Sequence, residues 1–333
     1  MTEHEDVRDL LAAWAFGALE PADAERVPLH LAGCESCAAE AERLRETVRL
    51  LDGPPIGGLP ARPATGLPPR LLARRPAAPR TAAHAAPYAA AVQGLRALLP
   101  EADGHWGTPV VHDWDVHATV AHLLAADEPL AGRLGVPARV PESALPQDLG
   151  WEDAWNRRTA EVIAHERGRT PGQTVAAWAG QADALLATPE ARDAELAARA
   201  EMLMGVRLPV ADHFVVRAFE AWIHTDDIGR ALGLTVPPPP EEHLGQLVRL
   251  AVRILGMALG PDAPPVLFSV SGVEQWVLGS AAEPVQAELA LDPVDFCLLV
   301  GGRCTPEEVP RSTTGDAAAV RNVLESAASL AWL

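Results

Sequence analysis

Apolar residues recur at helical spacing over most of the chain. Three such runs lie within the first fifty residues: 5–16 (EDVRDLLAAWAF), a second run that ends near Leu31, and AAEAERLRETVRLL after Cys34. Gly17 and Gly33 stand where the first two helices would end. The pattern predicts a unit of three short helices. A unit of this size has too small a core to be very stable without a staple.

The rest of the chain is predicted to be helical first and mixed later. Helices are expected near residues 86–99, 115–133, 151–166, 171–187, 211–232 and 241–259. Several of them are long and rich in Ala and Leu, which predicts a helix bundle. After the break at Pro237–Pro240 and the next helix come the strand-like runs PVLFSVSG, EQWVLG and VQAELAL, and then a helix over 315–330. The alternation in these runs predicts a small α+β domain.

Residues 52–83 separate these parts. Between residues 52 and 80 this segment is rich in Pro and Gly and carries five arginines against one acid. Its composition favours a flexible linker, and a partner-binding segment with a short helix, PPRLLARR, is the alternative. The predicted organisation is a three-helix unit over 1–51, a linker over 52–83, a bundle over 84–236 and an α+β domain over 240–333. The fold class is therefore mainly α with a C-terminal α+β domain.

Composition narrows the functions that this organisation can serve. The chain has 333 residues and a formal net charge of −18, which argues against direct nucleic-acid binding and is compatible with a basic protein partner. The longest apolar runs are too short for a membrane span. The acidic start MTEHEDVRD is unlike a secretory signal. We therefore expect a cytoplasmic protein that does not bind membranes.

The first candidate site lies in the segment HLAGCESC. His30, Cys34 and Cys37 are spaced i, i+4, i+7. A break at Gly33 would leave His30 at one helix end and the cysteines in the first turn of the next helix, where the helix dipole favours thiolates. A structural zinc ion needs four ligands, and His4 is the candidate for the last one. The alternatives are a chance grouping and, for His4, a solvated terminal histidine.

The second candidate site combines two distant segments. Glu220 and His224 are spaced i, i+4 in a strongly helical stretch and therefore share one face. His122 lies in the apolar run TVAHLL and should face the core, whereas His112 and His117 are expected to be more exposed. Together these residues could bind zinc or another divalent metal. The alternatives are an exposed helix-stabilising pair and a core histidine satisfied by a hydrogen bond.

Residues 4–50 resemble the zinc-binding anti-sigma factors, through the His of EHED and the run LLAAWAFGALEPADAERVPLHLAGCESCAAEAERLRE. The resemblance implies a three-helix zinc domain that binds a sigma factor and keeps it from RNA polymerase. This chain has a histidine where the redox-sensing members carry a further cysteine. Only two thiols remain among the candidate ligands, which argues against a thiol switch.

Residues 84–235 resemble the N-terminal domain of the mycothiol-dependent maleylpyruvate isomerase family, a four-helix bundle of the DinB type. The segments that carry the resemblance are HDWDVHATVAHLL and RAFEAWIHTDDIGRALG. The family's metal-binding His, Glu and His match His122, Glu220 and His224. Residues 240–333 resemble the family's C-terminal domain more loosely, through DFCLLVGGR. The resemblance implies mycothiol as a cosubstrate for isomerisation or thiol transfer.

Two further residues could assist such a site. Asp227, three residues after His224, could orient that ligand, and its alternative is an exposed acid near a helix end. Arg303, in the segment VGGRC, could hold a carboxylate substrate as a catalytic residue, and its alternative is a surface loop arginine. Cys297 is expected to be a buried apolar residue. Neither it nor Cys304, expected to be more exposed, is assigned a role.

Two functions follow from these observations. The first is a zinc-binding cytoplasmic regulator, an anti-sigma factor whose maleylpyruvate-isomerase-like region senses a thiol, a metal or another ligand. The second is a metal- and mycothiol-dependent isomerase or thiol transferase with an appended structural zinc finger. A bundle that has lost its activity and serves only in interactions is a third. The sequence favours the regulator, with the enzyme as the alternative.

Overall fold

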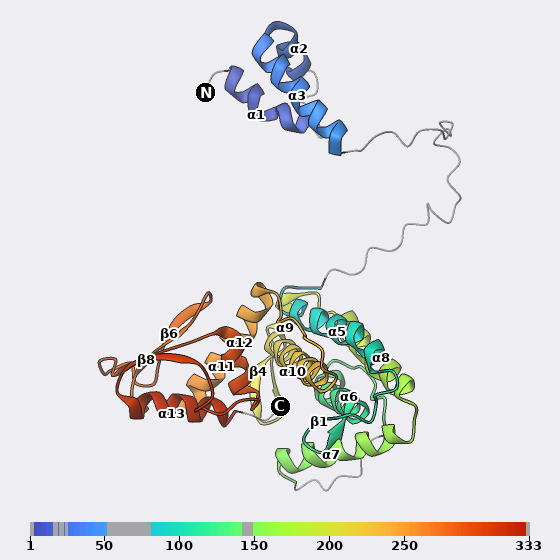
Figure 1. Ribbon diagram of the computed structural model, residues 1–333, viewed down its shortest axis with the longest axis vertical. Coiled ribbons are helices and arrows are strands. Elements are labelled where there is room, and N and C mark those ends of the chain that lie inside the picture. The colour runs from blue at the N-terminus through green and yellow to red at the C-terminus, as the bar shows by residue number, and fades with distance from the viewer. Residues whose placement is uncertain are drawn as a thin grey trace. The chain divides into compact units, whose positions relative to one another are not determined.

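The computed structural model describes residues 3–15, 19, 23, 26–51, 81–141 and 149–330. The chain divides into two compact units, Met1–Pro76 and Ala77–Leu333 (Figure 1). Most of the predicted linker, residues 52–80 with the segment PPRLLARR, lies outside the described residues. Each unit is described by itself below.

The first unit contains the three predicted helices. They are α1 (Glu3–Ala15), α2 (Arg26–Gly33) and α3 (Glu35–Leu51), and each contacts the other two. As predicted, Gly33 ends the second helix, and Cys34 is the single residue between α2 and α3. The sharp reversal at this point brings the end of α2 close to the first turn of α3.

The core of the first unit is small. Its buried hydrophobic residues, among those described, are Val7, Leu11, Val27, Cys37 and Ala41. Surface contacts add to it: the guanidinium of Arg45 lies 3.7 Å from the ring centroid of Trp14, on the neighbouring helix. So few buried side chains provide little hydrophobic stabilisation, and the unit needs another source of stability.

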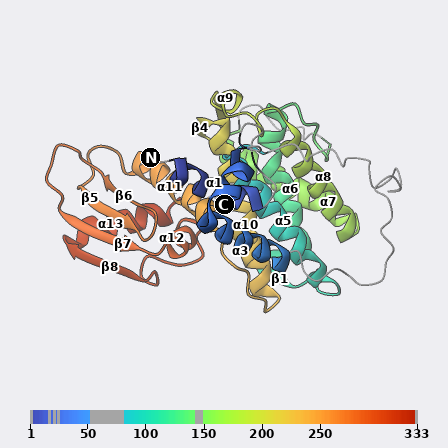
Figure 2. The ribbon, with the colours of Figure 1, turned by 90° about the horizontal axis from the view of Figure 1, so that it is seen from above.

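The second unit begins with a helix bundle. Its helices are α5 (Ala86–Leu98), α6 (Val116–Arg133), α7 (Trp151–Arg167), α8 (Pro171–Ala187) and α10 (Val210–Ala231). All five start and end within about two residues of the predicted bounds, inside the usual uncertainty of helix ends. Helix α10 packs directly on α5 and α6, and α8 packs on the outer side of these two helices (Figure 2). Nearly every residue of α10 between Val210 and Gly229 is buried.

Local signals in the sequence explain where these helices begin. The side chain of Asp115 accepts a hydrogen bond of 2.8 Å from the backbone N–H of Ala118 and caps α6. Thr170 and Gln173 form a reciprocal capping box at the start of α8, and Pro171 occupies its first turn. The cap at Asp115 fixes the helical phase that turns His122 towards the core.

The C-terminal region packs helices against a four-stranded sheet. Its elements are α11 (Glu241–Leu259), β5 (Val266–Val270), β6 (Glu274–Leu278), β7 (Ala287–Leu291), α12 (Pro293–Val300), β8 (Arg311–Gly315) and α13 (Ala317–Ala328). The strand order is β6-β5-β7-β8, with β5 and β7 parallel and the outer pairs antiparallel. Alternate residues of β5 and β7 are buried, as their period of two predicts. The mainly α fold with a C-terminal α+β region is thus confirmed.

The main hydrophobic core of the second unit joins the bundle to the C-terminal region, and a small separate cluster of Ala118, Ala121 and Ile163 lies between α6 and α7. The main core extends from Ala85 in the bundle to Leu330 at the end of the α+β region. The predicted boundary between 236 and 240 therefore falls inside a single compact unit, and the division into two domains there stays a prediction. A shared core allows residues of the C-terminal region to reach the bundle.

Several short elements were not predicted. They are the 3₁₀ turn η2 (Leu99–Ala102), β1 (Pro109–Val111), β2 (Trp114–Asp115), α9 (Ala194–Ala197), β3 (Ala200–Leu203), β4 (Val206–Pro209), α12 and β8. The hairpin β3–β4 turns at Met204 and Gly205, both of which have positive φ. Most of these elements have only two to four residues and are too short to show a hydrophobic period, and β8 is exposed throughout and shows no alternation.

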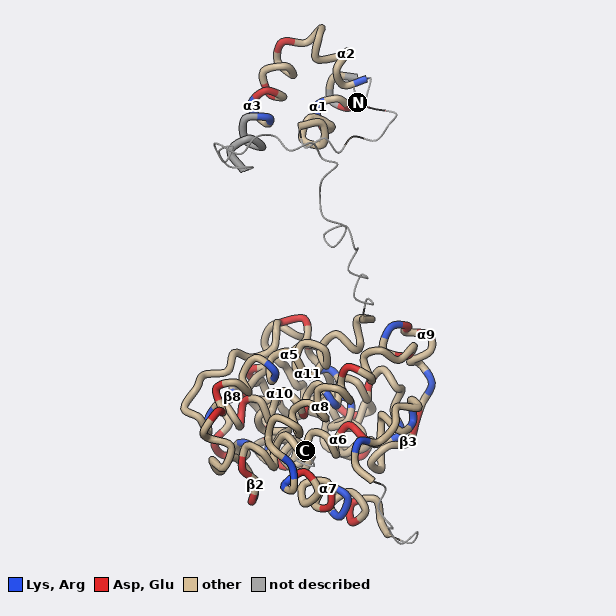
Figure 3. The backbone as a smooth tube through the Cα atoms, turned by 90° about the vertical axis from the view of Figure 1, so that its right-hand side faces the viewer, with Lys and Arg blue, Asp and Glu red and all other residues tan. Residues whose placement is uncertain are grey.

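The placement of charge distinguishes α10 from the outer helices. Arginine and acidic residues are frequent along α7 (Figure 3), and most of them are exposed. Helix α10 instead carries Arg217, Glu220 and Asp227 in buried positions. No helix among the described residues is long and apolar enough to cross a membrane. Burying a charged side chain costs free energy unless it is paired. The residues that pair with these charges on α10 therefore mark a candidate site.

Candidate metal centres

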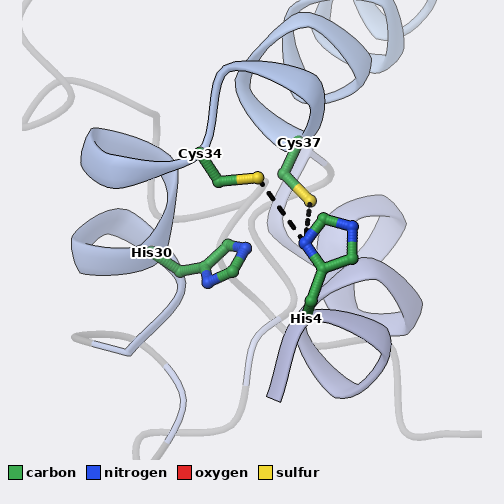
Figure 4. Close-up of side chains that lie close together, drawn as sticks. All are labelled: His4, His30, Cys34 and Cys37. Carbon is green, nitrogen blue, oxygen red and sulfur yellow. Dashed lines mark hydrogen bonds between the residues drawn. The ribbon is translucent and has the colours of Figure 1, made fainter. Parts of the chain in front are cut away.

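The first cluster joins all three helices of the first unit. His4 comes from α1, His30 from the last turn of α2, Cys34 from the reversal and Cys37 from the first turn of α3. The four side chains point towards one another (Figure 4), and their ligand atoms all lie within 4.8 Å of one another. The structure therefore brings together the four residues that the sequence predicted.

The distances within this cluster fit a zinc ion. The Nδ1 atom of His4 lies 3.5 Å from Cys34 Sγ and 3.7 Å from Cys37 Sγ. In a tetrahedral site with the usual Zn–S and Zn–N bond lengths, sulfur and nitrogen ligands are about 3.6 Å apart. The Nε2 atom of His30 is buried and has no hydrogen-bond partner among the described residues. Two thiols and two imidazoles are a common donor set for structural zinc.

The two thiols differ in their acidity. Hydrogen bonds from the side chain of Ser36, 3.3 Å away, and from the backbone of Cys37 lower the pKa of Cys34 to about 6. Burial raises the pKa of Cys37, and the neighbouring Cys34 raises it further. Zinc requires both residues as thiolates. The surrounding protein disfavours the thiolate of Cys37, and a bound metal ion would stabilise it.

The second cluster lies at the centre of the bundle. His122 comes from α6, and Glu220 and His224 come from α10, and the three residues are 2%, 1% and 0% exposed. The Nε2 atom of His122 lies 2.8 Å from Glu220 Oε1, across a sequence separation of 98 residues. The ligand atoms of all three residues lie within 4.8 Å of one another. The Nε2 atom of His224 is buried without a partner in the described part of the chain. This donor set fits a divalent metal.

Arg217 supports the carboxylate of this cluster. Its Nη1 atom lies 2.5 Å from Glu220 Oε2 and donates a hydrogen bond of 2.7 Å to the carbonyl of Ala126. Burial by itself would raise the pKa of Glu220, but Arg217 and the hydrogen bond with His122 outweigh burial and lower it to about 2. Glu220 is therefore a carboxylate at neutral pH, as a metal ligand must be.

Asp227 and Arg303 support His224. Asp227 Oδ2 lies 3.1 Å from His224 Nδ1 and 2.5 Å from the Nη2 atom of Arg303. Burial lowers the pKa of His224 to about 4, so the ring is neutral at pH 7. The Nδ1–H group of the neutral ring can donate a hydrogen bond to the carboxylate of Asp227, which leaves the lone pair of Nε2 free to bind a metal. An outer carboxylate of this kind commonly fixes the orientation of a metal-binding histidine.

Arg303 connects the C-terminal region to the bundle. Its side chain is 8% exposed, and besides Asp227 it lies 3.5 Å from His224 Nδ1. The carboxylate that Arg303 holds in the structure is thus that of Asp227, on the protein itself. Its predicted role towards a substrate carboxylate stays a prediction.

The other predicted histidines lie outside the cluster. His112 is exposed and packs against Trp114, whose ring stacks on that of His122 at 4.4 Å. His117 is half-buried, and its Nε2 lies 2.8 Å from Thr174 Oγ1. Cys297 is buried as expected. The stacked ring of Trp114 therefore covers one face of the His122 imidazole.

Three buried residues near the cluster were missed. Arg217 is one of them, and the others are Tyr88 and Asp127, joined by a hydrogen bond of 2.6 Å from the phenol to the carboxylate. An arginine three residues before Glu220 in an apolar helix was the available signal for Arg217. Nothing in the sequence around Tyr88 and Asp127 indicates that they meet, because 39 positions separate them.

Comparison with known proteins identifies both regions. Residues 5–38 match the family described as "Putative zinc-finger", and residues 85–229 match the family described as "Mycothiol maleylpyruvate isomerase N-terminal domain". The two matches fall on the stretches that carry the two resemblances, a zinc finger near the N-terminus and a maleylpyruvate isomerase-like domain after residue 84. The zinc-finger match begins one residue after His4.

Two solved structures are similar to part of the chain. The crystal structure of the mycothiol-dependent maleylpyruvate isomerase has a TM-score of 0.47 and 12% identity, and covers 70% of this chain and 93% of that chain. A histidine-to-alanine mutant of that isomerase has the same TM-score and coverage, with 15% identity. No curated protein matches the chain significantly.

Proposed function

We propose that the chain is a zinc-dependent regulator of the anti-sigma type. Its first unit would bind a sigma factor, and its second unit would sense a thiol, a metal or another small ligand. The observation that carries this proposal is the cluster of His4, His30, Cys34 and Cys37, to which all three helices of the unit contribute. A sigma factor acts in the cytoplasm, so we place the protein there.

A metal at this cluster would have a structural role. Three helices with five buried apolar residues among those described gain little from packing, whereas a zinc ion would cross-link every helix to the others. The helices so fixed would present the apolar side chain of Leu29 on α2, which is 75% exposed.

Capture of sigma factors from the host tests this function. The full chain would be used as bait against each purified sigma factor, beside the variants Cys37→Ser and Cys304→Ser. We expect at least one sigma factor to bind the wild type and the Cys304 variant, and binding to be lost with Cys37→Ser. Failure of the wild-type chain with every sigma factor of the host would contradict the proposal.

The second candidate function is an enzyme, and the buried cluster of His122, Glu220 and His224 favours it. A metal bound there would lower the pKa of a coordinated thiol such as mycothiol. The residues of the chain have definite tasks in this reaction. Arg217 keeps Glu220 ionised, and Asp227 holds the ring of His224 in place.

The enzyme hypothesis has its own test. His122→Ala should remove the metal of the second unit and any mycothiol-dependent turnover of maleylpyruvate together. His117→Ala is the matched control, because His117 lies on the same helix but outside the cluster. Turnover that persists in metal-free His122→Ala would exclude the metal mechanism. Absence of turnover in the metal-loaded wild type would leave the regulator as the function.

A further inference from the structure

The two histidines of the second cluster are held in different ways. Asp227 Oδ2 lies 3.1 Å from His224 Nδ1 and fixes that ring through a hydrogen bond. The Nδ1 atom of His122 is buried and makes no hydrogen bond to any described residue, and its Nε2 atom faces the other ligand, Glu220. A metal-binding histidine usually donates its second ring N–H to a carboxylate or a carbonyl, which sets the orientation of the ring. For His122, a contact of another kind has to set it.

The ring of His122 is surrounded by other aromatic rings. Trp114 is stacked on one face, with the ring centroids 4.4 Å apart and 27° between the planes. The rings of Trp155 and His224 approach at 5.9 Å and 4.9 Å, with the planes close to perpendicular. The stack is the contact that restrains rotation about the Cβ–Cγ bond, because an imidazole turned away from the parallel plane would collide with the indole.

The local sequence explains why Trp114 reaches this position. It lies on β2, directly before Asp115, the residue that caps α6. Its side chain packs against the small cluster that contains Ala118 and Ala121 of α6. These small side chains leave room for the indole to lie along the helix. His122 follows Ala118 by four residues and therefore shares this side of α6.

The β1–β2 hairpin holds Trp114 from its other side. Trp114 pairs with Val111 across the hairpin, and His112 in the turn has a positive φ of 53°. The imidazole of His112 meets the indole edge-on, with the ring centroids 5.0 Å apart and 68° between the planes. A residue with a side chain is held in the left-handed region at a cost in free energy, where surrounding contacts fix it. The contacts that place Trp114 thus involve no metal ligand other than His122.

We propose that Trp114 is a positioning residue of the second metal site, and that its stacking orients His122 as the hydrogen bond from Asp227 orients His224. The proposal rests on the metal-binding role proposed for this cluster. An aromatic pair contributes less free energy than a hydrogen bond to a charged group. His122 is therefore the less firmly held of the two histidine ligands, and the affinity of the site depends on the indole.

Titration of the full chain with Co²⁺ tests this role. Every protein in the series carries Cys34→Ser and Cys37→Ser, so that the measured affinity belongs to the second cluster. Trp114→Leu keeps an apolar side chain but removes the stack, and should weaken Co²⁺ binding roughly three- to tenfold. The visible absorption of bound Co²⁺ depends on the geometry of its ligands and should change as well. Trp114→Phe keeps a ring that can stack, and should restore both the affinity and the spectrum.

Trp276→Leu is the matched control. Trp276 is also half-buried and contacts an aromatic ring, that of Phe268, but it lies on β6, outside the cluster. Urea unfolding of the metal-free proteins separates a loss of stability from a loss of metal affinity.

Three outcomes would overturn the proposal. Equal Co²⁺ affinity in the Trp114→Leu and Trp276→Leu variants would do so and leave the metal site intact. Equal losses of affinity in Trp114→Leu and Trp114→Phe would show that the volume of the indole matters and its stacking does not. A parent chain that binds no Co²⁺ would overturn the proposal together with the metal-binding role of the cluster.

Discussion

The two metal clusters of this chain lie in opposite surroundings. The first joins three helices whose described core has five buried apolar side chains, and its ligand His4 is exposed. The second is enclosed in a bundle whose main core continues into the C-terminal region, and all three of its ligands are buried. The difference indicates what each metal would contribute: folding in the first unit, and chemistry or sensing in the second, which is stabilised without a metal.

The largest effect is expected when the first cluster loses a ligand. Cys37→Ser should abolish zinc binding and unfold the first unit, because structural zinc contributes roughly 10–16 kcal/mol in small zinc domains. The second unit should stay folded. Digestion with an arginine-specific protease would measure this, through rapid cleavage at Arg8 and Arg26. Cys304→Ser is the control. A first unit that resists cleavage in the Cys37 variant would contradict a folding role for the first metal.

The next effect concerns the buried charges of the second cluster. Glu220→Gln in metal-free protein should lower the free energy of unfolding by about 3–5 kcal/mol, because it leaves the charge of Arg217 buried without a partner. Urea denaturation would measure it. Adding Arg217→Met to this variant should recover most of the loss. A loss below about 1 kcal/mol would mean that water reaches Arg217.

A smaller effect depends on pH. Burial raises the pKa of Asp127 to about 7, so the unfolded chain releases this proton at lower pH than the folded chain does. The contribution of Asp127 to stability is therefore greatest at low pH and is lost as the pH rises through about 7. Between pH 5 and 8 the wild type should lose about 2 kcal/mol relative to Asp127→Asn.

Urea unfolding at several pH values would measure this difference. Asp103→Asn is the control, because Asp103 is exposed. The sign is informative, since a wild type that gains stability relative to Asp127→Asn over this range would show that Asp127 is ionised in the folded protein. Both variants keep Tyr88, whose phenol donates a hydrogen bond of 2.6 Å to Asp127 in the wild type.

The smallest effect is expected at the surface of the first unit. Arg45→Ala removes the guanidinium over the ring of Trp14 and should cost about 0.5–1 kcal/mol. Thermal unfolding of the zinc-loaded protein would detect it as a small shift of the first transition. A loss comparable to that of Cys37→Ser would show that surface packing, and not the metal, maintains this unit.

The long helices could be predicted from the sequence because each shows its own hydrophobic period and its own end signals. Strand β8 could not, since its residues RSTTG are exposed on both faces and show no alternation. The hairpin β3–β4 has four-residue strands, too short for a period to be seen. The position of such short elements depends on their packing against distant parts of the chain, which the local sequence does not indicate.

The two metal sites also differ in how far the local sequence predicts them. His30, Cys34 and Cys37 could be found from local spacing, since eight residues contain all three. His122 and Glu220 are 98 positions apart, so no local spacing joins them. The apolar run around His122 indicated only that it faces the core, and the family resemblance then matched it to the ligand set. Arg217 was missed although its carboxylate partner, Glu220, lies only three residues further along the same helix. The carbonyl of Ala126, to which Arg217 also donates, is 91 positions away and could not be found from the local sequence.

The metal content of the purified full-length protein tests the central claim most directly. Inductively coupled plasma mass spectrometry should find two metal ions per wild-type chain, and one in each of the variants Cys37→Ser and His122→Ala. The Cys37 variant should lose zinc together with its folded first unit, whereas the His122 variant should lose its metal and remain folded. A wild-type chain with a single metal ion, unchanged by His122→Ala, would contradict the account of two independent sites.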